Sequence, residues 1–149
     1  MSRPTEIDRN APVVADHRIT IRAPRAGAWK LLTEISEWPR WQTDIREAAL
    51  EAPLAPGAAF RWTTFGMTIT STVYALEDGV RILWGGDAGG IVGIHEWTFT
   101  DVPEGVEVRT RESFGGPPVA ADAPKMQALL DGSLVSWLQR LKAAAESTR

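Results

Sequence analysis

Alternation of apolar and polar side chains begins near residue 13 and predicts a strand there. His17, Ile19 and Ile21 fall on one face of an extended chain, while the residues between them are polar. This period of two is typical of a strand with one buried face. Residues 1–12 are polar, contain proline and have no period, so we expect a flexible N-terminal tail before one domain over residues 13–146.

Two short helices are expected directly after this strand. Pro24 is well placed for the first turn of a helix, and Trp29, Leu32 and Ile35 then recur at helical spacing. Ser36 follows as the N-cap of a second short helix. The chain is therefore predicted to pass through two helical segments before it returns to strands.

Strand patterns separated by turn residues fill the middle of the chain. The predicted strands span residues 45–51, 59–65, 67–77, 81–85, 91–101 and 106–114. Residues 85–90, Gly-Gly-Asp-Ala-Gly-Gly, are expected to form a loop, and residues 102–105 to connect the clearest hairpin. Residues 115–118, Gly-Gly-Pro-Pro, are interpreted as a connecting loop, with a hinge or lid beside a cavity as the alternative.

A long amphipathic helix is predicted at the C-terminal end, with Asp122 as its cap. Its apolar stripe consists of Met126, Leu130, Leu134, Trp137 and Leu141. Gly132, inside this helix, costs about 1 kcal/mol relative to alanine and indicates a bend or a close contact. One sheet and one long helix bury each other only if the sheet curls around the helix. The predicted fold class is therefore α+β, with a curved antiparallel seven-stranded sheet wrapped around the C-terminal helix.

Composition removes several classes of function. The 149 residues include no cysteine, which excludes disulfides, thiolate metal sites and thiol catalysis. With 16 Lys and Arg against 19 Asp and Glu, and no basic stretch, nucleic acid is not an expected partner. Apolar runs are too short for a membrane span or a leader, so we expect a cytoplasmic protein without membrane insertion. Seven tryptophans indicate either a Trp-rich core or a cavity with flat, rigid walls.

Several motifs resemble those of a known superfamily. They are Ile21-Arg22-Ala23-Pro24, Trp29, the run from Leu31 to Trp41, Trp84, His95-Glu96-Trp97-Thr98-Phe99, Gly105 and Glu112-Ser113-Phe114-Gly115. Over roughly residues 13–146 the chain resembles the START-like, polyketide cyclase/dehydrase and lipid-transport (SRPBCC) superfamily, whose helix-grip fold is shared with the birch-pollen-allergen type. The resemblance implies a cavity between the sheet and the last helix. Because members include cyclases, carriers, hormone receptors and chaperone co-factors, it implies no single reaction, and no cofactor is expected.

The register of the last hairpin decides which of its residues face the helix. If residues 102–105 form the loop, Asp101 faces Val106, and His95 then lies opposite Glu112. Apolar residues share the face of this pair, which marks that face as the inner one. A slip of one residue would move the pair to the outside.

His95 and Glu112 are the most chemically distinctive pair in the chain. Burial raises the pKa of a glutamate and a protonated histidine lowers it, so the pair is suited to general acid–base catalysis near neutral pH. In the superfamily's usual strand order the first strand lies antiparallel beside the last, so His17 would approach the Glu112 end and is a third titratable candidate. The structural alternative is that His95 and Glu112 only satisfy each other or a water molecule. A zinc site of both histidines and Glu112 is a weaker alternative, and no metal is expected. On the outer face, Glu96 and Arg111 are expected to pair in solvent.

Cavity walls are predicted from the same inward faces. The sheet candidates are Phe60, Trp62, Ile69, Ser71, Val73, Trp84, Trp97, Phe99 and Thr110, and the helix candidates are Met126, Leu130, Leu134 and Trp137. Each of these side chains is also compatible with a filled core. Trp29, Trp38 and Trp41 are expected to pin the short helices to the sheet.

Three functions follow from these features. The first is binding of an apolar or aromatic small molecule, such as a lipid or a polyketide-like compound, oriented by His95 and Glu112. The second is a cyclase or dehydratase in which this pair moves protons. The third is a protein-interaction module with a filled cavity, of the chaperone-activating type. The chain is expected to be a monomer or a homodimer.

Overall fold

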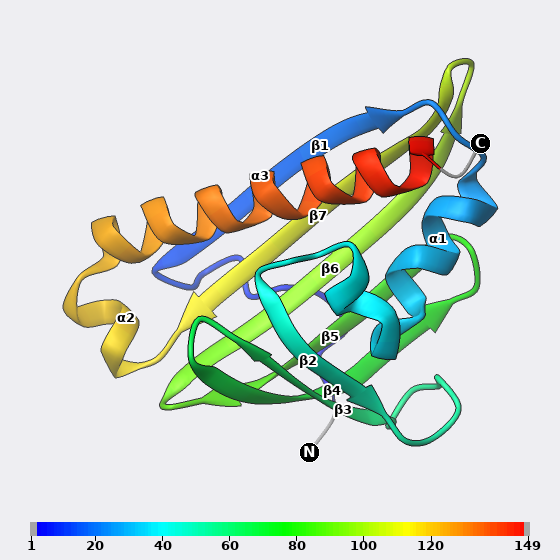
Figure 1. The fold of residues 1–149 in the computed structure, drawn as a ribbon. Helices are drawn as coiled ribbons and strands as arrows, with labels where there is room; N and C mark the ends of the chain where they lie inside the picture. The colour runs from blue at the N-terminus through cyan, green and yellow to red at the C-terminus, as the bar shows by residue number, and fades with distance from the viewer. Residues whose placement is uncertain (1–2, 148–149) are drawn as a thin grey trace.

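A seven-stranded antiparallel sheet curls around one side of a long helix in the computed structural model, which describes residues 3–147 (Figure 1). The strands are β1 Val13–Ile21, β2 Ile45–Leu50, β3 Ala59–Thr64, β4 Met67–Glu77, β5 Arg81–Ala88, β6 Ile91–Val102 and β7 Gly105–Gly115. Their order across the sheet is β1-β7-β6-β5-β4-β3-β2. β1 is thus an edge strand that pairs with β7, the last strand of the chain. All other neighbouring strands follow one another directly in the sequence. The predicted α+β architecture is confirmed.

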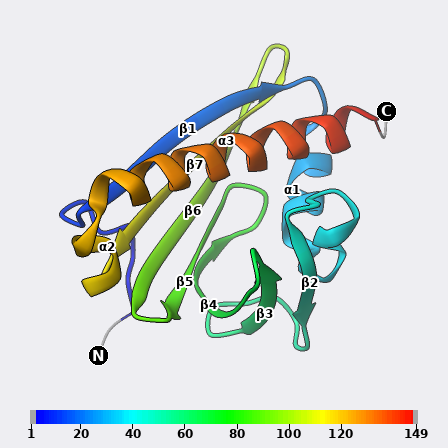
Figure 2. The same ribbon diagram turned by 60° about the vertical axis from the view of Figure 1, so that its left-hand side comes forward.

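Four helical segments accompany the sheet in the described part of the chain. They are α1 Arg25–Thr33, the 3₁₀ helix η1 Ile35–Arg40, α2 Pro117–Ala121 and α3 Ala123–Ser147. The long helix α3 runs across the concave side of the sheet, and α1 and η1 close one end of the same side (Figures 1 and 2). No helix among residues 3–147 is long and apolar enough to cross a membrane.

Trp38 is the centre of the core under α3. Its side chain is fully buried, and its indole N–H donates to the Leu32 carbonyl at 2.9 Å. Its ring meets Phe60 of the sheet and Trp137 of α3 edge to face, with centroids 5.5 and 5.2 Å apart. Such contacts join helix η1, the sheet and α3 in one apolar cluster. The expectation that Trp38 pins a short helix to the sheet is confirmed.

The β6–β7 hairpin has the predicted register with a shorter loop. Val102 pairs with Gly105, so only Pro103 and Glu104 form the turn. His95 lies opposite Glu112, as the sequence predicted. The helix cap was also predicted correctly, because an Asp122 carboxylate oxygen accepts the Lys125 backbone N–H at 3.3 Å.

Three local predictions were wrong. Residues 85–88 continue strand β5, and only Gly89 and Gly90 turn, because both have positive φ. Residues 117–121 form the short helix α2, since two prolines are compatible with a first helical turn. Ser36 lies inside η1 and accepts the Leu50 backbone N–H at 3.1 Å instead of capping a helix.

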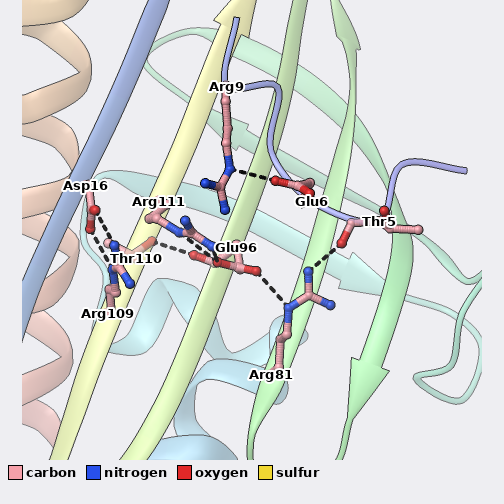
Figure 3. Close-up of polar contacts among 9 residues, drawn as sticks. All are labelled: Thr5, Glu6, Arg9, Asp16, Arg81, Glu96, Arg109, Thr110 and Arg111. Carbon is pink, nitrogen blue, oxygen red and sulfur yellow. Dashed lines mark hydrogen bonds and ion pairs between the residues drawn. The ribbon is translucent and has the colours of Figure 1, made fainter. Parts of the chain in front are cut away.

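Residues 3–12 were expected to be a loose tail and instead lie across the outer face of the sheet (Figure 3). Ile7 is 4% exposed and packs with Leu83 and Ile94. Arg81 donates to the Thr5 carbonyl at 2.7 Å. One apolar anchor and a backbone contact therefore hold a segment whose composition alone indicated no structure.

Glu96 lies on the same outer face of the sheet and shares Arg81 with the N-terminal segment. The residue was expected in solvent but is 4% exposed, and it accepts hydrogen bonds from Arg81 at 2.7 Å and Arg111 at 2.9 Å (Figure 3). Burial alone would raise the pKa of Glu96, but the hydrogen bonds from Arg111 and Arg81 outweigh it and keep this pKa below its ordinary value. Glu96 is therefore a buried ionic anchor of the outer face.

Candidate functional site

A cavity of about 690 Å³ lies between the concave face of the sheet and α3. Its predicted wall residues that do line it are Trp62, Ile69, Ser71, Trp84, Met126, Leu130 and Trp137, together with His95 and Glu112. The Trp62 indole N–H donates to the Ser71 hydroxyl at 3.1 Å. The lining is therefore mainly apolar, with a few polar groups at defined positions.

Six predicted wall residues do not reach this cavity and form the core instead. They are Phe60, Val73, Trp97, Phe99, Thr110 and Leu134, all at most 3% exposed. Their side chains do face inward, but α1, η1 and the C-terminal half of α3 fill that end of the sheet. Phe99, for example, packs on Trp29 at 5.2 Å and Trp97 on Trp137 at 5.4 Å between ring centroids. The prediction failed because inward direction does not distinguish core from cavity.

Part of the cavity wall on the sheet was missed, in part because residues 85–88 were taken for a loop. Gly86, Ala88, Ile91 and Gly93 line the cavity from strands β5 and β6. The remaining lining residues that were not predicted are Asp44, Thr64, Phe65, Met67, Gly85, Phe114, Ala128, Leu129, Gly132, Ser133 and Ser136. Extending the strand through residue 88 would have given Gly86 and Ala88, which alternate with Trp84.

Apolar side chains surround the cavity's opening. Phe65 is 74% exposed, Met67 45% and Leu129 58%, and all three also line the cavity. Residues that are both lining and exposed must lie where the cavity meets solvent. The opening is therefore between the β3–β4 turn and α3.

Gly132 widens the cavity from the helix side. It was expected to mark a bend or a close contact, yet a Cβ at this position would have no atom within 4 Å. Gly132 and Ser133 line the cavity together. The small side chains of α3 thus leave open space beside the large apolar side chains of the same helix.

His95 and Glu112 are adjacent in the cavity wall. The His95 Nδ1 and Glu112 Oε1 atoms are 3.4 Å apart, and the side chains are 3% and 16% exposed. Both residues line the cavity, so the accessible part of Glu112 faces apolar space. The predicted neighbourhood of the pair is confirmed, while its role is not tested by position alone.

The tautomer of His95 follows from its second neighbour. The Thr110 hydroxyl donates to the Glu96 carbonyl at 3.1 Å, which uses its only proton. It lies 2.7 Å from His95 Nε2, and while it donates to Glu96 it accepts a hydrogen bond there. In this arrangement His95 carries its proton on Nε2, and its Nδ1 presents a lone pair toward Glu112. Thr110, predicted as a wall residue, has this orienting position behind the wall instead.

Burial shifts both pKa values toward the neutral forms. Desolvation raises the pKa of Glu112 to about 8 and lowers the pKa of His95 to about 3. At neutral pH the pair consists of a carboxylic acid and an uncharged imidazole. The acid proton can then be donated to His95 Nδ1 or to a molecule in the cavity.

His17 does not join this pair. Its strand partner is Thr110, whereas Ala15 is the residue opposite Glu112. His17 Nε2 lies 2.7 Å from a carboxylate oxygen of Asp131 on α3, and His17 is not part of the cavity lining. The prediction that His17 approaches Glu112 is wrong, because the β1–β7 register could not be read from the sequence. A zinc site formed by both histidines and Glu112 is therefore also excluded. Within residues 3–147 no three His, Cys, Asp or Glu side chains lie close enough together to hold a metal ion.

In the described part of the chain the cavity lining carries two carboxyl groups but no Lys or Arg side chain. Asp44 and Glu112 are its ionisable carboxyl groups, and no Lys or Arg is among the lining residues of the described chain. Asp44 is neutralised from outside the lining by Arg140 at 3.5 Å, and Ser136 donates to it at 3.3 Å. The cavity thus offers no cation to an anionic molecule.

Solved structures with the same fold come from several bacterial proteins. A START superfamily protein from Mycobacterium smegmatis matches with a TM-score of 0.80 at 12% identity, over 91% of this chain and 99% of that one. The Zhui aromatase/cyclase from Streptomyces sp. R1128 matches with a TM-score of 0.77 at 15% identity, over 89% and 93%. The di-domain aromatase/cyclase StfQ of the steffimycin pathway matches with 0.76 at 21% identity, over 91% of this chain and 51% of that one. At these identities the likeness shows the fold.

Sequence comparison gives the family. No curated protein matches the chain. The family model described as polyketide cyclase/dehydrase and lipid transport matches residues 12–146, nearly the whole chain. The match includes the cavity lining and the His95–Glu112 pair. The chain therefore belongs to the polyketide cyclase/dehydrase and lipid transport family.

Proposed function

We propose that this protein binds an uncharged, largely apolar or aromatic small molecule inside the cavity beneath α3. The observation that carries the proposal is the cavity itself, whose volume of about 690 Å³ lies in the usual range of small-molecule pockets, roughly 300–1,000 Å³. Flat indole walls and a small number of polar groups are the common composition of such pockets. Burial of ligand surface would supply affinity at ~25 cal/mol per Å².

The charge of the lining selects the kind of ligand. A carboxylate moved from water into an apolar cavity without a cation loses its hydration and gains no partner. Glu112 in its acid form instead donates a hydrogen bond, and the free Nδ1 of His95 accepts one. Hydroxyl and keto groups fit both partners. We therefore expect phenols and ketones to bind more tightly than acids of the same shape.

Binding can be tested with an uncharged dye. N-phenyl-1-naphthylamine should fluoresce more strongly on entering the cavity, and 2-naphthol should displace it at lower concentration than 2-naphthoate. Native mass spectrometry of freshly purified protein should show an added mass that is lost on denaturation. Absence of both dye binding and added mass would contradict the proposal, and equal displacement by 2-naphthoate would contradict its charge selectivity.

A second candidate function, acid–base catalysis, is favoured by the contact of His95 Nδ1 with Glu112 at 3.4 Å and by the raised pKa of Glu112. A carboxyl group with a pKa near 8 suits proton transfer at neutral pH. His95, with its pKa lowered to about 3, holds no second proton there and cannot return one. Glu112 would therefore accept the proton from the substrate and later return it, while His95 holds the Glu112 carboxyl group in position.

The reaction that fits is loss of water from a bound β-hydroxy ketone. The Glu112 carboxylate would remove a proton from the carbon that lies between the carbonyl carbon and the hydroxyl-bearing carbon. The carbon–oxygen bond to the hydroxyl then breaks, the protonated Glu112 supplies the proton that makes it water, and a double bond forms. Substrate, product and water balance without an oxidant or a cofactor.

A simple probe for this step is 3-hydroxy-1-tetralone, which becomes 1-naphthol on losing water. Formation of 1-naphthol should rise with pH through about 8, because the carboxylate of Glu112 is the base. Glu112→Gln should abolish the acceleration but keep the binding of 2-naphthol. Unchanged turnover in that variant would exclude catalysis by this pair and leave ligand binding as the function.

The interaction-module alternative requires side chains in place of the cavity. An open space of about 690 Å³ argues against it. Ligand binding is therefore the function that the site supports best.

A further inference from the structure

Two glycines face each other on the inner side of the sheet under α3. Gly86 of β5 pairs with Gly93 of β6, and both line the cavity. On either side of this pair the inward positions carry side chains, with Trp84 opposite His95 and Ala88 opposite Ile91. The glycine pair is therefore a gap in the floor of the cavity.

Gly86 has a backbone reason to be glycine. A Cβ at this position would lie 2.6 Å from the Thr70 carbonyl oxygen, which is too close for any side chain. Backbone sterics alone thus explain Gly86.

Gly93 has no such reason. Its φ is outside the left-handed region, and a Cβ would meet the Phe114 ring at 3.4 Å and Glu112 Oε2 at 3.5 Å. These distances correspond to ordinary contact. A glycine inside a strand weakens it, and where the backbone does not require one, close approach of a ligand is a common cause. The contact atoms lie at the polar end of the cavity.

We propose that Gly93 is a specificity-determining residue, over which the end of a flat ligand passes to reach Glu112. The inference rests on the proposed binding function and deepens it. A molecule lying over Gly93 contacts the Phe114 ring and the Glu112 carboxyl group together, because both border the position of the missing Cβ. Gly93 then limits how far an extended ring system penetrates along the floor, and smaller ligands depend on it less.

The test is to restore a side chain and compare ligands of two lengths. Gly93→Val places two methyl groups in the gap, and Gly93→Ala places one carbon at ordinary contact distance. The ligands are 2-naphthol, with two fused rings, and 1-hydroxypyrene, with four, measured by displacement of N-phenyl-1-naphthylamine. Gly115→Val is the matched control, since Gly115 lies in strand β7 outside the lining and its Cβ would meet nothing within 4 Å.

Gly93→Val should weaken the binding of 1-hydroxypyrene roughly tenfold. This is the effect expected when about 50 Å² of apolar ligand surface is no longer buried. Gly93→Val should change the binding of 2-naphthol by less than about threefold, and Gly93→Ala should be intermediate. The control should match the unsubstituted protein for both ligands. Melting temperatures identify a variant that fails to fold, in which case Gly93→Ala decides.

Two other results would overturn the inference in distinguishable ways. If 1-hydroxypyrene binds the unsubstituted protein and both Gly93 variants equally, ligands do not pass over Gly93, although the cavity remains the binding site. If neither ligand nor the dye binds the unsubstituted protein, the proposed function is wrong and the inference is lost with it.

Discussion

At the scale of single residues, the distinctive feature is a neutral carboxyl–imidazole pair in an apolar wall. Counting cross-strand pairs outward from the β6–β7 turn predicted that His95 and Glu112 are neighbours, because register in an antiparallel hairpin is a local property. The same counting could not find the partner of His17, since β1 joins the sheet from about ninety residues away along the chain. Nor could it show that the Thr110 hydroxyl lies between His95 Nε2 and the Glu96 carbonyl, because this contact depends on a side-chain rotamer behind the wall.

The first prediction concerns the pH dependence of stability. Glu112 has its pKa raised from 4.5 to about 8 in the folded state, so its contribution is fully present below pH 4.5 and is lost as the pH rises through 8. His95, lowered from 6.5 to about 3, contributes stability above pH 6.5 that is lost as the pH falls toward 3. Between pH 4.5 and 6.5 Glu112 lowers the unfolding free energy as the pH rises, while His95 increases it. From pH 6.5 to 8 only the effect of Glu112 remains.

Urea unfolding at pH 6.5 and 8 should therefore separate Glu112→Gln from the unsubstituted protein. The unsubstituted protein should lose about 2 kcal/mol more of its unfolding free energy over this range, at ~1.4 kcal/mol per unit. All other titrating groups are common to both proteins and cancel in the comparison. Parallel losses in the two proteins would show that Glu112 is ionised at neutral pH.

The second prediction concerns Phe65 in the two-residue β3–β4 turn. Phe65 and Gly66 have φ of 48° and 76°, the geometry that favours asparagine followed by glycine. A phenylalanine there is strained, and it is 74% exposed at the cavity's opening. Phe65→Asn should stabilise the fold by about 1 kcal/mol and weaken binding of N-phenyl-1-naphthylamine.

Phe65→Leu is the control for this change, because leucine keeps both the apolar contact and the backbone strain. It should leave thermal stability and dye affinity nearly unchanged. If Phe65→Asn binds the dye as well as the unsubstituted protein, Phe65 has no part in ligand entry.

At the scale of elements, the N-terminal segment behaves as a cover of the sheet's outer face. Its composition predicted no structure, and a single apolar residue among polar neighbours carries no periodic signal. Ile7 nevertheless closes the outer cluster with Leu83 and Ile94, and the Thr5 carbonyl accepts a hydrogen bond from Arg81, which also donates to Glu96 (Figure 3). Sequence patterns predict elements that repeat a period, and they miss segments that are ordered by one anchor.

The third prediction follows from this anchor. Ile7→Ala should lower the unfolding free energy by about 2 kcal/mol, because Ile7 is 4% exposed. Val80→Ala, at a side chain that is 45% exposed, should change it by less than about 0.5 kcal/mol. Neither should affect dye binding, since both lie outside the cavity lining. Chemical denaturation of the two variants checks the difference, and equal effects would mean that the segment does not stabilise the sheet.

At the scale of the whole molecule, a curled sheet and one helix bury each other incompletely. The architecture could be predicted because its strands, turns and amphipathic helix each leave a local signal. The boundary between core and cavity could not, because Phe60, Trp97 and Leu134 face inward like the true lining. It depends on which end of the sheet α1 and η1 fill, and on small residues such as Gly93 and Gly132 at the other end.

The most direct measurement is a crystal structure of the protein soaked with 2-naphthol. The two rings should lie between the sheet and α3, and the hydroxyl group should lie within hydrogen-bond distance of Glu112. An empty cavity at saturating 2-naphthol, or a ligand bound only on the outer surface, would contradict the proposed function.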